Sequence, residues 1–295
     1  MKMSLERKTM LGYFLLTLPA LFVFLMIVYY PFINSIFYSF TDWSGISLHK
    51  NFVGLENYAA LPDDKLIKAG IWNTILIGLY AAIIQNVLSL ALALALDSKL
   101  RLQGYYKAVF YIPCLFSILI ISPIFGNIFQ YSGLFNALIS QIGFSHLAED
   151  WFGTIRTALP MLMLTNSWQW VGFGSVIYLA GLQSIPPDYY EAGHIDGATK
   201  LQAFFKITFP MLMPSVTILT FLNLVNGLKT FELPFVLTNG GPGYATETVG
   251  TVIYELGFRQ GKMGYASAIS VVFFSVIAVV SILQLKLTRS REVEL

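Results

Sequence analysis

Long apolar runs alternate with short polar connections along most of this chain. One helical crossing of a bilayer needs about 20 consecutive, mostly apolar residues, because the hydrocarbon core is about 30 Å thick. Backbone polar groups in that core must be paired within the segment, which favours α-helices. We therefore predict an all-α, polytopic membrane bundle, a single domain over residues 1–295 with six transmembrane helices. They are expected at residues 10–32, 71–96, 108–129, 157–182, 210–228 and 263–287.

The composition agrees with a membrane protein. Of the 295 residues, 56% are hydrophobic and only 12% are charged, whereas a soluble globular domain carries roughly 25% charged residues. Lys2, Arg7 and Lys8 precede the first apolar run, as they would in a secretory signal peptide. The run is too long for such a peptide and no small-residue cleavage site follows it, so we expect a retained first helix.

The distribution of basic residues predicts the orientation. If the N-terminus is cytoplasmic, eleven of the 18 Lys and Arg residues fall in cytoplasmic segments and seven in outer segments. Cytoplasmic loops of membrane proteins carry an excess of Lys and Arg. We therefore expect both the N- and the C-terminus to be cytoplasmic.

Residues 189–210 form a polar segment on the expected cytoplasmic side, between the fourth and fifth apolar runs. Asp188 can cap a short helix with Glu191 three residues on, Gly197 ends that helix, and residues 198–209 can form a second helix. The pattern predicts a helix–turn–helix on the cytoplasmic face. A short projecting helix suits docking to a cytoplasmic partner, and the alternative is a loop packed only on its own bundle.

Four sequence segments resemble a known family. The spacing of Glu191-Ala192-Gly193, Gly197 and Ile207-Thr208-Phe209-Pro210 resembles the cytoplasmic "EAA" coupling loop of bacterial ABC-importer permeases, with Gly for the usual third Ala and Phe for the usual Leu. Nearly the whole chain is similar to carbohydrate-importer permeases of the maltose/glycerol-phosphate/raffinose type. The segments that carry this likeness are NFVGLENYAAL (51–61), YKAVFYIP (106–113), GLQSIPPDYYEAGHIDGA (181–198) and LTNGGPG (237–243).

The resemblance implies the partners and their contacts. The coupling loop, residues 186–209, would insert a helix into a cleft on a cytoplasmic ATPase dimer and transmit its closure to the spans. The other implied partners are a second homologous permease, an extracytoplasmic sugar-binding protein, the sugar and the bilayer of a bacterial cytoplasmic membrane, with no nucleic acid. ATP and Mg would be bound by the ATPase, so we expect no cofactor on this chain. The expected coupling residues are Tyr190, Glu191, Ala192, Gly193, Asp196 and Gly197.

Polar and aromatic side chains inside the fourth and fifth runs are candidates for the sugar pathway, because polar residues in a membrane are costly. Asn166, Trp170 and Phe173 follow an i, i+4, i+7 spacing on one helical face, with Gln169 adjacent. Amides can bond neighbouring hydroxyls and rings can stack on pyranose faces; the alternative is interhelical hydrogen bonding and a Trp belt. By resemblance, these four residues, together with Gly227 and Thr230, match sugar-contacting positions of the family.

Other polar residues near these candidates have either two possible roles or a structural one. Lys229 and Glu232 fit an outer-interface ion pair as well as a ligand role, while Gln85 and Asn86 are expected to serve packing. Aromatics and amides with few cations suit a neutral oligosaccharide better than a phosphorylated sugar.

The three outer segments, at residues 41–69, 131–156 and 231–262, are long enough to have structure of their own. Their simplest interpretation is a set of solvated connectors. Their apolar and aromatic content favours packing on the bundle mouth or on a docked protein. Thr238–Gly243 is a dense turn signal in the last of them.

The residues that are missing also limit the function. No Asp, Glu or His lies mid-span, no Walker A motif is present, and the single cysteine and three scattered histidines have no metal-ligand spacing. We therefore predict a permease that is not an enzyme, holds no metal and takes its energy from a separate polypeptide. The alternatives are a secondary sugar transporter working without an ATPase and a membrane enzyme acting on lipid-linked sugars.

Overall fold

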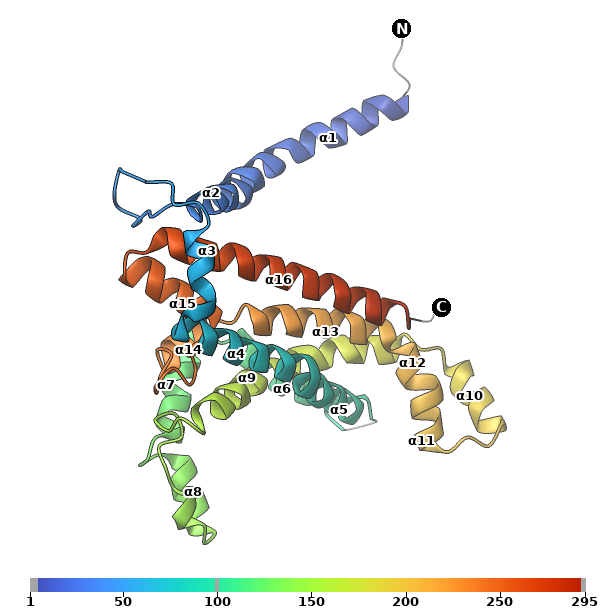
Figure 1. Ribbon diagram of the computed structural model, residues 1–295. Helices are drawn as coiled ribbons and strands as arrows, with labels where there is room; N and C mark the ends of the chain where they lie inside the picture. The colour runs from blue at the N-terminus through green and yellow to red at the C-terminus, as the bar shows by residue number, and fades with distance from the viewer. Residues whose placement is uncertain (1–4, 99–100, 293–295) are drawn as a thin grey trace. The chain divides into compact units, whose positions relative to one another are not determined.

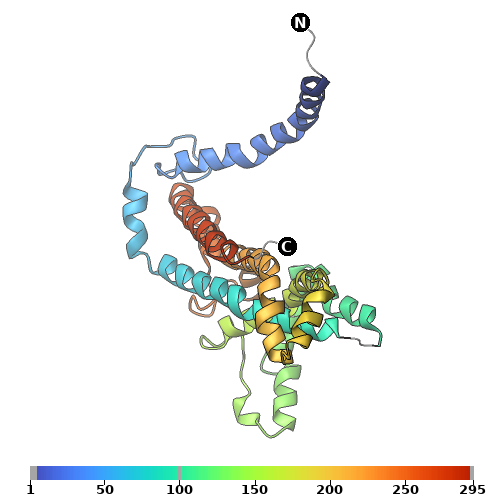
Figure 2. The same cartoon turned by 90° about the vertical axis from the view of Figure 1, so that its right-hand side faces the viewer.

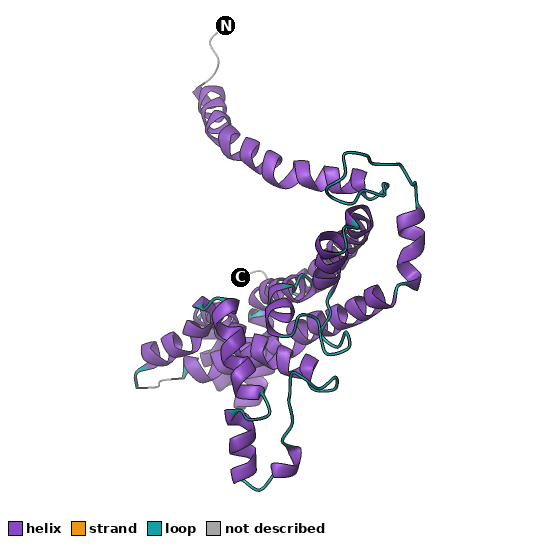
Figure 3. Ribbon diagram, turned by 90° about the vertical axis from the view of Figure 1, so that its left-hand side faces the viewer, coloured by secondary structure: helices purple, strands orange, loops and turns teal. Residues whose placement is uncertain are grey.

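The computed structural model describes residues 5–98 and 101–292, and within them every regular element is a helix (Figure 3). This confirms the all-α prediction. The chain divides into two compact units, residues 1–62 with 253–273 and residues 63–252 with 274–295.

The first unit begins with a long helix that continues through a π-helical turn (blue in Figure 1). The following loop is pinned by an isolated antiparallel bridge between Thr41 and Phe52. The N–H of Gly264, at the start of the last helix, donates to Trp43 O at 2.8 Å, and its Cα faces the Thr41 backbone. The elements are α1 (Leu5–Phe24), η1 (Leu25–Tyr29), α2 (Tyr30–Tyr38), α3 (Glu56–Ala60) and the first turns of α16 (Met263–Arg289).

The second unit is built around three long helical segments: α4–η3–α5, α9 and α13. Its helices before α9 are α4 (Lys65–Tyr80), η3 (Ala81–Gln85), α5 (Asn86–Asp97), α6 (Gln103–Tyr111), η4 (Ile112–Leu115), α7 (Ile118–Phe129), α8 (Leu134–Gln141) and η5 (Ser145–Leu147). Those from α9 on are α9 (Ala158–Gln183), α10 (Pro187–Ile195), α11 (Lys200–Ala203), η6 (Phe204–Thr208), α12 (Phe209–Met211), α13 (Met213–Leu228) and α14 (Glu232–Leu237). Three short elements lie where the chain passes between the units: η2 (Leu61–Asp63) at the first passage, and α15 (Val249–Tyr254) and η7 (Glu255–Arg259) at the second.

Small residues set the packing of the three long segments. A Cβ on Gly227 of α13 would lie 2.9 Å from the Cα of Gly78 on α4, and a Cβ on Gly174 of α9 would collide with Ser89 of α5. Such close approach is typical of membrane helices, where tight packing replaces the hydrophobic effect between helices. Tyr178 of α9 is fully buried in the same core.

Four helices in the described part of the chain are long and apolar enough to cross a membrane: Gly12–Tyr38, Lys65–Asp97, Ile118–Gln141 and Met263–Arg289. Lys200–Met211 and Met213–Leu228 would together make a fifth, bent by 66°. The fourth expected span forms α9, a helix of 26 residues. Its polar side chains, Asn166 to Gln169 among them, lower its hydropathy, and α9 is not among the four helices named above.

The stretch expected as one helix at residues 108–129 is divided into two. Helix α6 passes through the 3₁₀ turn η4, Phe116 is extended at ψ 137°, and Ser117 caps α7 with its side chain accepting from Leu119 N. Pro113 lies in η4 and lacks an N–H, and a serine N-cap satisfies one of the free donors of a new helix. The division places the backbone carbonyl of Phe116 where a neighbouring helix can reach it.

The outer segment at residues 131–156 is folded. Helix α8 forms where the amphipathic pattern predicts it, and its segment extends away from α9 and α13 in both views (Figures 1 and 2). Asn136 is buried and ties the segment together: its Nδ2 donates to Glu149 O at 2.7 Å, and its Oδ1 accepts from Trp151 Nε1 at 2.8 Å. The segment is therefore more than a solvated connector.

Candidate functional site

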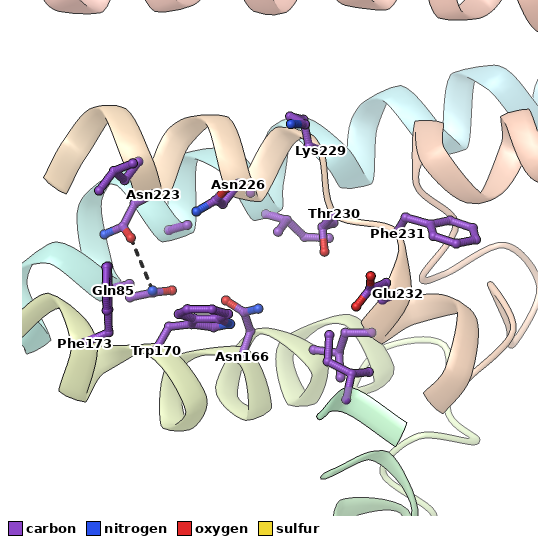
Figure 4. Close-up of a pocket in the computed structure, with 16 residues that line it drawn as sticks. Gln85, Asn166, Trp170, Phe173, Asn223, Asn226, Lys229, Thr230, Phe231 and Glu232 are labelled. Carbon is purple, nitrogen blue, oxygen red and sulfur yellow. Dashed lines mark hydrogen bonds between the residues drawn. The ribbon is translucent and has the colours of Figure 1, made fainter. Parts of the chain in front are cut away.

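The second unit contains a cavity of about 360 Å³ between α4–η3, α9, α13 and the start of α14 (Figure 4). This volume is within the usual range for small-molecule sites, roughly 300–1,000 Å³. The lining combines apolar surface with amide, hydroxyl and charged groups. Its residues are Ile77, Ala81, Gln85, Ile118, Asn166, Trp170, Phe173, Leu222, Asn223, Asn226, Gly227, Lys229, Thr230, Phe231, Glu232 and Leu233.

One wall of the cavity is a single face of α9. Asn166, Trp170 and Phe173 all line the cavity and are half-buried, as their helical spacing predicts. The rings of Trp170 and Phe173 meet edge to face, with centroids 5.9 Å apart and planes at 88°. Such a contact fixes both rings. The wall therefore presents an amide beside two ordered aromatic rings.

The C-terminal end of α13 forms the opposite wall. Asn223, Asn226, Gly227 and Thr230 line the cavity across from α9 (Figure 4). A Cβ on Gly227 would point at Gly78 and Ala81, so the glycine lets this end of α13 approach α4 closely. The expected pathway residues Gly227 and Thr230 thus face the same cavity as Asn166, Trp170 and Phe173.

Gln169 lies elsewhere. It does not line the cavity; its Nε2 donates to Phe116 O at 3.0 Å, at the break between α6 and α7, and the side chain is 2% exposed. Its proposed role on the sugar pathway stays a prediction without geometric support here. Its signals were adjacency to the Asn166 face and the match to a sugar-contacting position of the resembled family, and position i+3 from Asn166 can face either the cavity or the flanking helix.

Gln85 lines the cavity from the π-helical turn η3, although its pattern suggested only a packing role. Its Nε2 donates to Asn223 Oδ1 across a distance of 3.4 Å. A π-helical turn inside an α-helix is uncommon and often marks a functional site. The position of a π-helical turn cannot be found from hydropathy. Its extra residue changes which face of the helix each following residue occupies.

Two charged residues lie at the α14 end of the cavity. Lys229 and Glu232 are both exposed and both line it. Among the described residues, the one salt bridge joins Arg259 to Glu255, so Lys229 and Glu232 do not form the ion pair that the sequence allowed. Their charges remain exposed to solvent at the rim.

The predicted helix–turn–helix is present at residues 186–209. Helix α10 begins at Pro187 with Pro186 as its N-cap, so Asp188 lies in the first turn and is not the cap. Proline suits the first helical position because its fixed φ is already helical and its missing N–H is not needed there. Gly197 makes the turn at φ +76°, and a capping box between Thr199 and Gln202 starts α11.

Two contacts join α10 to the second helix of this hairpin. Tyr190 Oη lies 3.0 Å from Thr208 Oγ1, and a Cβ on Gly193 would lie 2.9 Å from Ile207 Cδ1. Glycine at the third motif position therefore lets the two helices pack closely. The other expected coupling residues, Glu191, Ala192, Asp196 and Gly197, are exposed. The hairpin is thus tied on one side and presents a free polar and apolar surface on the other.

Comparisons with known proteins show the family to which the chain belongs. The family described as the binding-protein-dependent transport system inner membrane component matches residues 74–293. A multiple sugar-binding transport system permease protein of Streptococcus mutans is 36% identical over 265 residues, 90% of this chain and 91% of that protein. A probable starch degradation products transport system permease protein of Thermoanaerobacterium thermosulfurigenes is 36% identical over 292 residues, 98% of this chain and 97% of that protein.

A solved structure shows the same fold. The structure of a bacterial alginate ABC transporter in complex with alginate pentasaccharide-bound periplasmic protein contains a chain with a TM-score of 0.82 to this one. The two are 24% identical, and the match covers 97% of this chain and 96% of that one.

The family match, the relatives and the helical fold together identify a membrane-embedded permease of the ABC-importer class. The chain belongs to the binding-protein-dependent transport system inner membrane component family. The resemblance drawn from the coupling-loop motif is confirmed at the level of the family.

Proposed function

We propose that this chain is one permease subunit of an ATP-driven importer for a neutral oligosaccharide. The observation that supports it most is the cavity itself, where Asn166 lies beside the rings of Trp170 and Phe173 on α9 and the amides of α13 face them. Amides can bond to hydroxyls, while rings offer an apolar face, and a sugar has both surfaces. The relatives named for multiple sugars and for starch degradation products support a carbohydrate as the substrate.

The proposed topology has six spans with both termini in the cytoplasm. It takes α6, η4 and α7 together as the third span, with α8 outside. It counts α9 as the fourth span, although its polar side chains make it less apolar than its neighbours, and the bent pair ending in α13 as the fifth. Residues 1–295 would then form a single permease domain. The basic residues that predict this orientation lie next to the spans, where the positive-inside preference acts.

The α10 hairpin would couple the spans to a separate ATPase dimer. A hairpin joined internally through Tyr190 and Gly193 can move as one body, so a cleft closing around α10 would shift α12 and α13 with it. ATP and Mg would be bound by the ATPase, and this chain would carry out no chemistry. A second homologous permease would form the other half of the pathway, and a sugar-binding protein would deliver the substrate outside.

Reconstitution tests this function. The chain is placed in proteoliposomes with its partner permease, ATPase and binding protein, and uptake of labelled neutral oligosaccharides is measured. We expect uptake that requires ATP and the binding protein and stops when ATP is replaced by a non-hydrolysable analogue. Uptake by this chain alone, driven by an ion gradient, would instead establish the secondary-transporter alternative.

A further inference from the structure

We propose that Gln85, on the π-helical turn η3, is a substrate-contacting residue that selects for one sugar hydroxyl in the cavity. This inference rests on the proposed sugar pathway and adds a residue from a third helix to its two walls. Gln85 is 4% exposed and Asn223 is 7% exposed, so both amides are more than nine-tenths buried. Figure 4 shows them meeting at one end of the cavity, with Gln85 between the two walls.

The two amides leave hydrogen-bonding capacity unused. Their single mutual bond spans 3.4 Å, at the long limit for N–H···O. Within the described residues, Gln85 Oε1 and Asn223 Nδ2 have no hydrogen-bond partner. Buried polar groups in proteins are nearly always paired. Other buried oxygens of the described residues are unpaired too, Gln169 Oε1 among them, but Gln85 Oε1 and Asn223 Nδ2 are the two such atoms that belong to residues lining the cavity, where a ligand could pair them.

The chemistry of that ligand does not depend on how each amide is turned. Whichever of the two donates to the other, one carbonyl oxygen and one NH₂ group remain. A hydroxyl can donate to the first while it, or its neighbour on the ring, accepts from the second. Two adjacent hydroxyls of a neutral sugar meet both needs, whereas a phosphate or carboxylate has no hydrogen to give to the carbonyl.

Asn86, the residue after Gln85, provides a comparison, because its amide is paired within the protein core. Asn86 accepts from Tyr178 Oη at 2.8 Å and donates to Ala82 O at 2.8 Å, and it does not line the cavity. Its oxygen and its nitrogen are both used by the core. The two adjacent amides therefore face different surroundings, and of the two it is Gln85, on the cavity side, whose oxygen is unpaired.

Transport of monodeoxy analogues tests the assignment. Uptake is measured in the reconstituted complex with the binding protein saturated by each sugar, so that its own selectivity does not contribute. For the wild type we expect one deoxy analogue to be transported about tenfold more slowly than the parent sugar, since a polar site rejects a ligand that leaves it unpaired. In Gln85→Met, parent uptake should fall to the level of that analogue and the ratio should approach one.

Gln284→Met is the matched control, because it removes a half-buried amide of α16 that does not line the cavity. It should leave the ratio unchanged. Gln85→Asn keeps the amide but shortens its reach, and serves if the Met variant does not assemble; we expect a reduced ratio with intact assembly.

Retained discrimination against every analogue in an assembled Gln85 variant overturns the inference while wild-type uptake still supports the proposed function. A wild type that discriminates against no analogue overturns the inference too, and one that transports no sugar overturns both.

Discussion

Two tryptophans on α9 allow the effect of lining the cavity to be separated from the effect of the residue type. Trp170 lines the cavity, whereas Trp168, two residues away, is 45% exposed and contacts Phe125, with ring centroids 5.0 Å apart and planes at 57°. Positions i and i+2 of a helix point about 200° apart. The same residue type on the same helix therefore occupies two different environments.

We predict that Trp170→Ala lowers sugar uptake about five- to thirtyfold, because a buried apolar contact of this size is worth ~1–2 kcal/mol. Asn166→Ala should also weaken uptake, through loss of a hydrogen bond. Trp168→Ala is the control and should retain uptake close to that of the wild type. Initial uptake rates in proteoliposomes, normalised to assembled complex, measure the effect. Equal losses in both tryptophan variants would mean that α9 acts only as a structural helix.

Glu191 provides a second residue-scale test, since its side chain is exposed on α10. We predict that Glu191→Ala keeps the protein in the membrane but weakens ATPase association or abolishes coupled transport. Asp188→Ala, one turn earlier on the same face of α10, is the control and should have a smaller effect. Co-purification with the ATPase and ATP-dependent uptake measure the two consequences. An intact, fully active Glu191→Ala complex would contradict the coupling role.

At the scale of elements, the outer turn Thr238–Gly243 is held by its own side chains. Thr246 Oγ1 lies 2.6 Å from Thr238 Oγ1 and donates to Gly241 O at 2.7 Å. Gly240 adopts φ +80°, and a Cβ there would collide with the Glu247 carboxylate. A Cβ on Gly241 would meet only Thr238 O, at 3.3 Å. The two adjacent glycines thus differ in how much the fold depends on them.

We therefore predict that Gly240→Val destabilises the protein by about 1–3 kcal/mol through backbone strain and overlap. It should lower the protein yield and the ATPase activity of the reconstituted complex, both basal and stimulated by the sugar-loaded binding protein. Gly241→Val should fold and retain basal activity, yet lose stimulation by the sugar-loaded binding protein if the turn touches that partner. Thermal unfolding in detergent and ATPase assays with and without binding protein separate the two. Full stimulation of the Gly241 variant would limit the turn to a folding role.

For the whole molecule, the orientation can be tested with two exposed side chains. Leu48 is 96% exposed in the segment expected outside, and Ile195 is 86% exposed in the α10 hairpin expected inside. Cys114 is the only cysteine, so Cys114→Ser provides a background without thiols. In intact cells, a membrane-impermeant maleimide should label Leu48→Cys, and it should label Ile195→Cys only after the membrane is opened. The reverse pattern would invert the proposed topology.

The sequence by itself determined the class of the protein and most of its helices. Hydropathy depends on local composition, so the apolar runs predicted the membrane helices and the polar segment at residues 186–209 predicted the α10 hairpin. The motif from Glu191 to Pro210 identified the family because its residue types and spacing are local. Helical periodicity also placed Asn166, Trp170 and Phe173 on one face, as the structure has them.

Only the tertiary structure decided which polar residues share the cavity. The break after η4 gives Gln169 a backbone partner at Phe116, and the π-helical turn η3 brings Gln85 to Asn223 on α13. The approach of Gly227 to Gly78 sets which faces of α4 and α13 meet. Periodicity assigns a residue to a face of its own helix, but the surroundings of that face depend on contacts between residues far apart in the chain. Gln85 and Asn223, 138 positions apart, are neighbours for that reason alone.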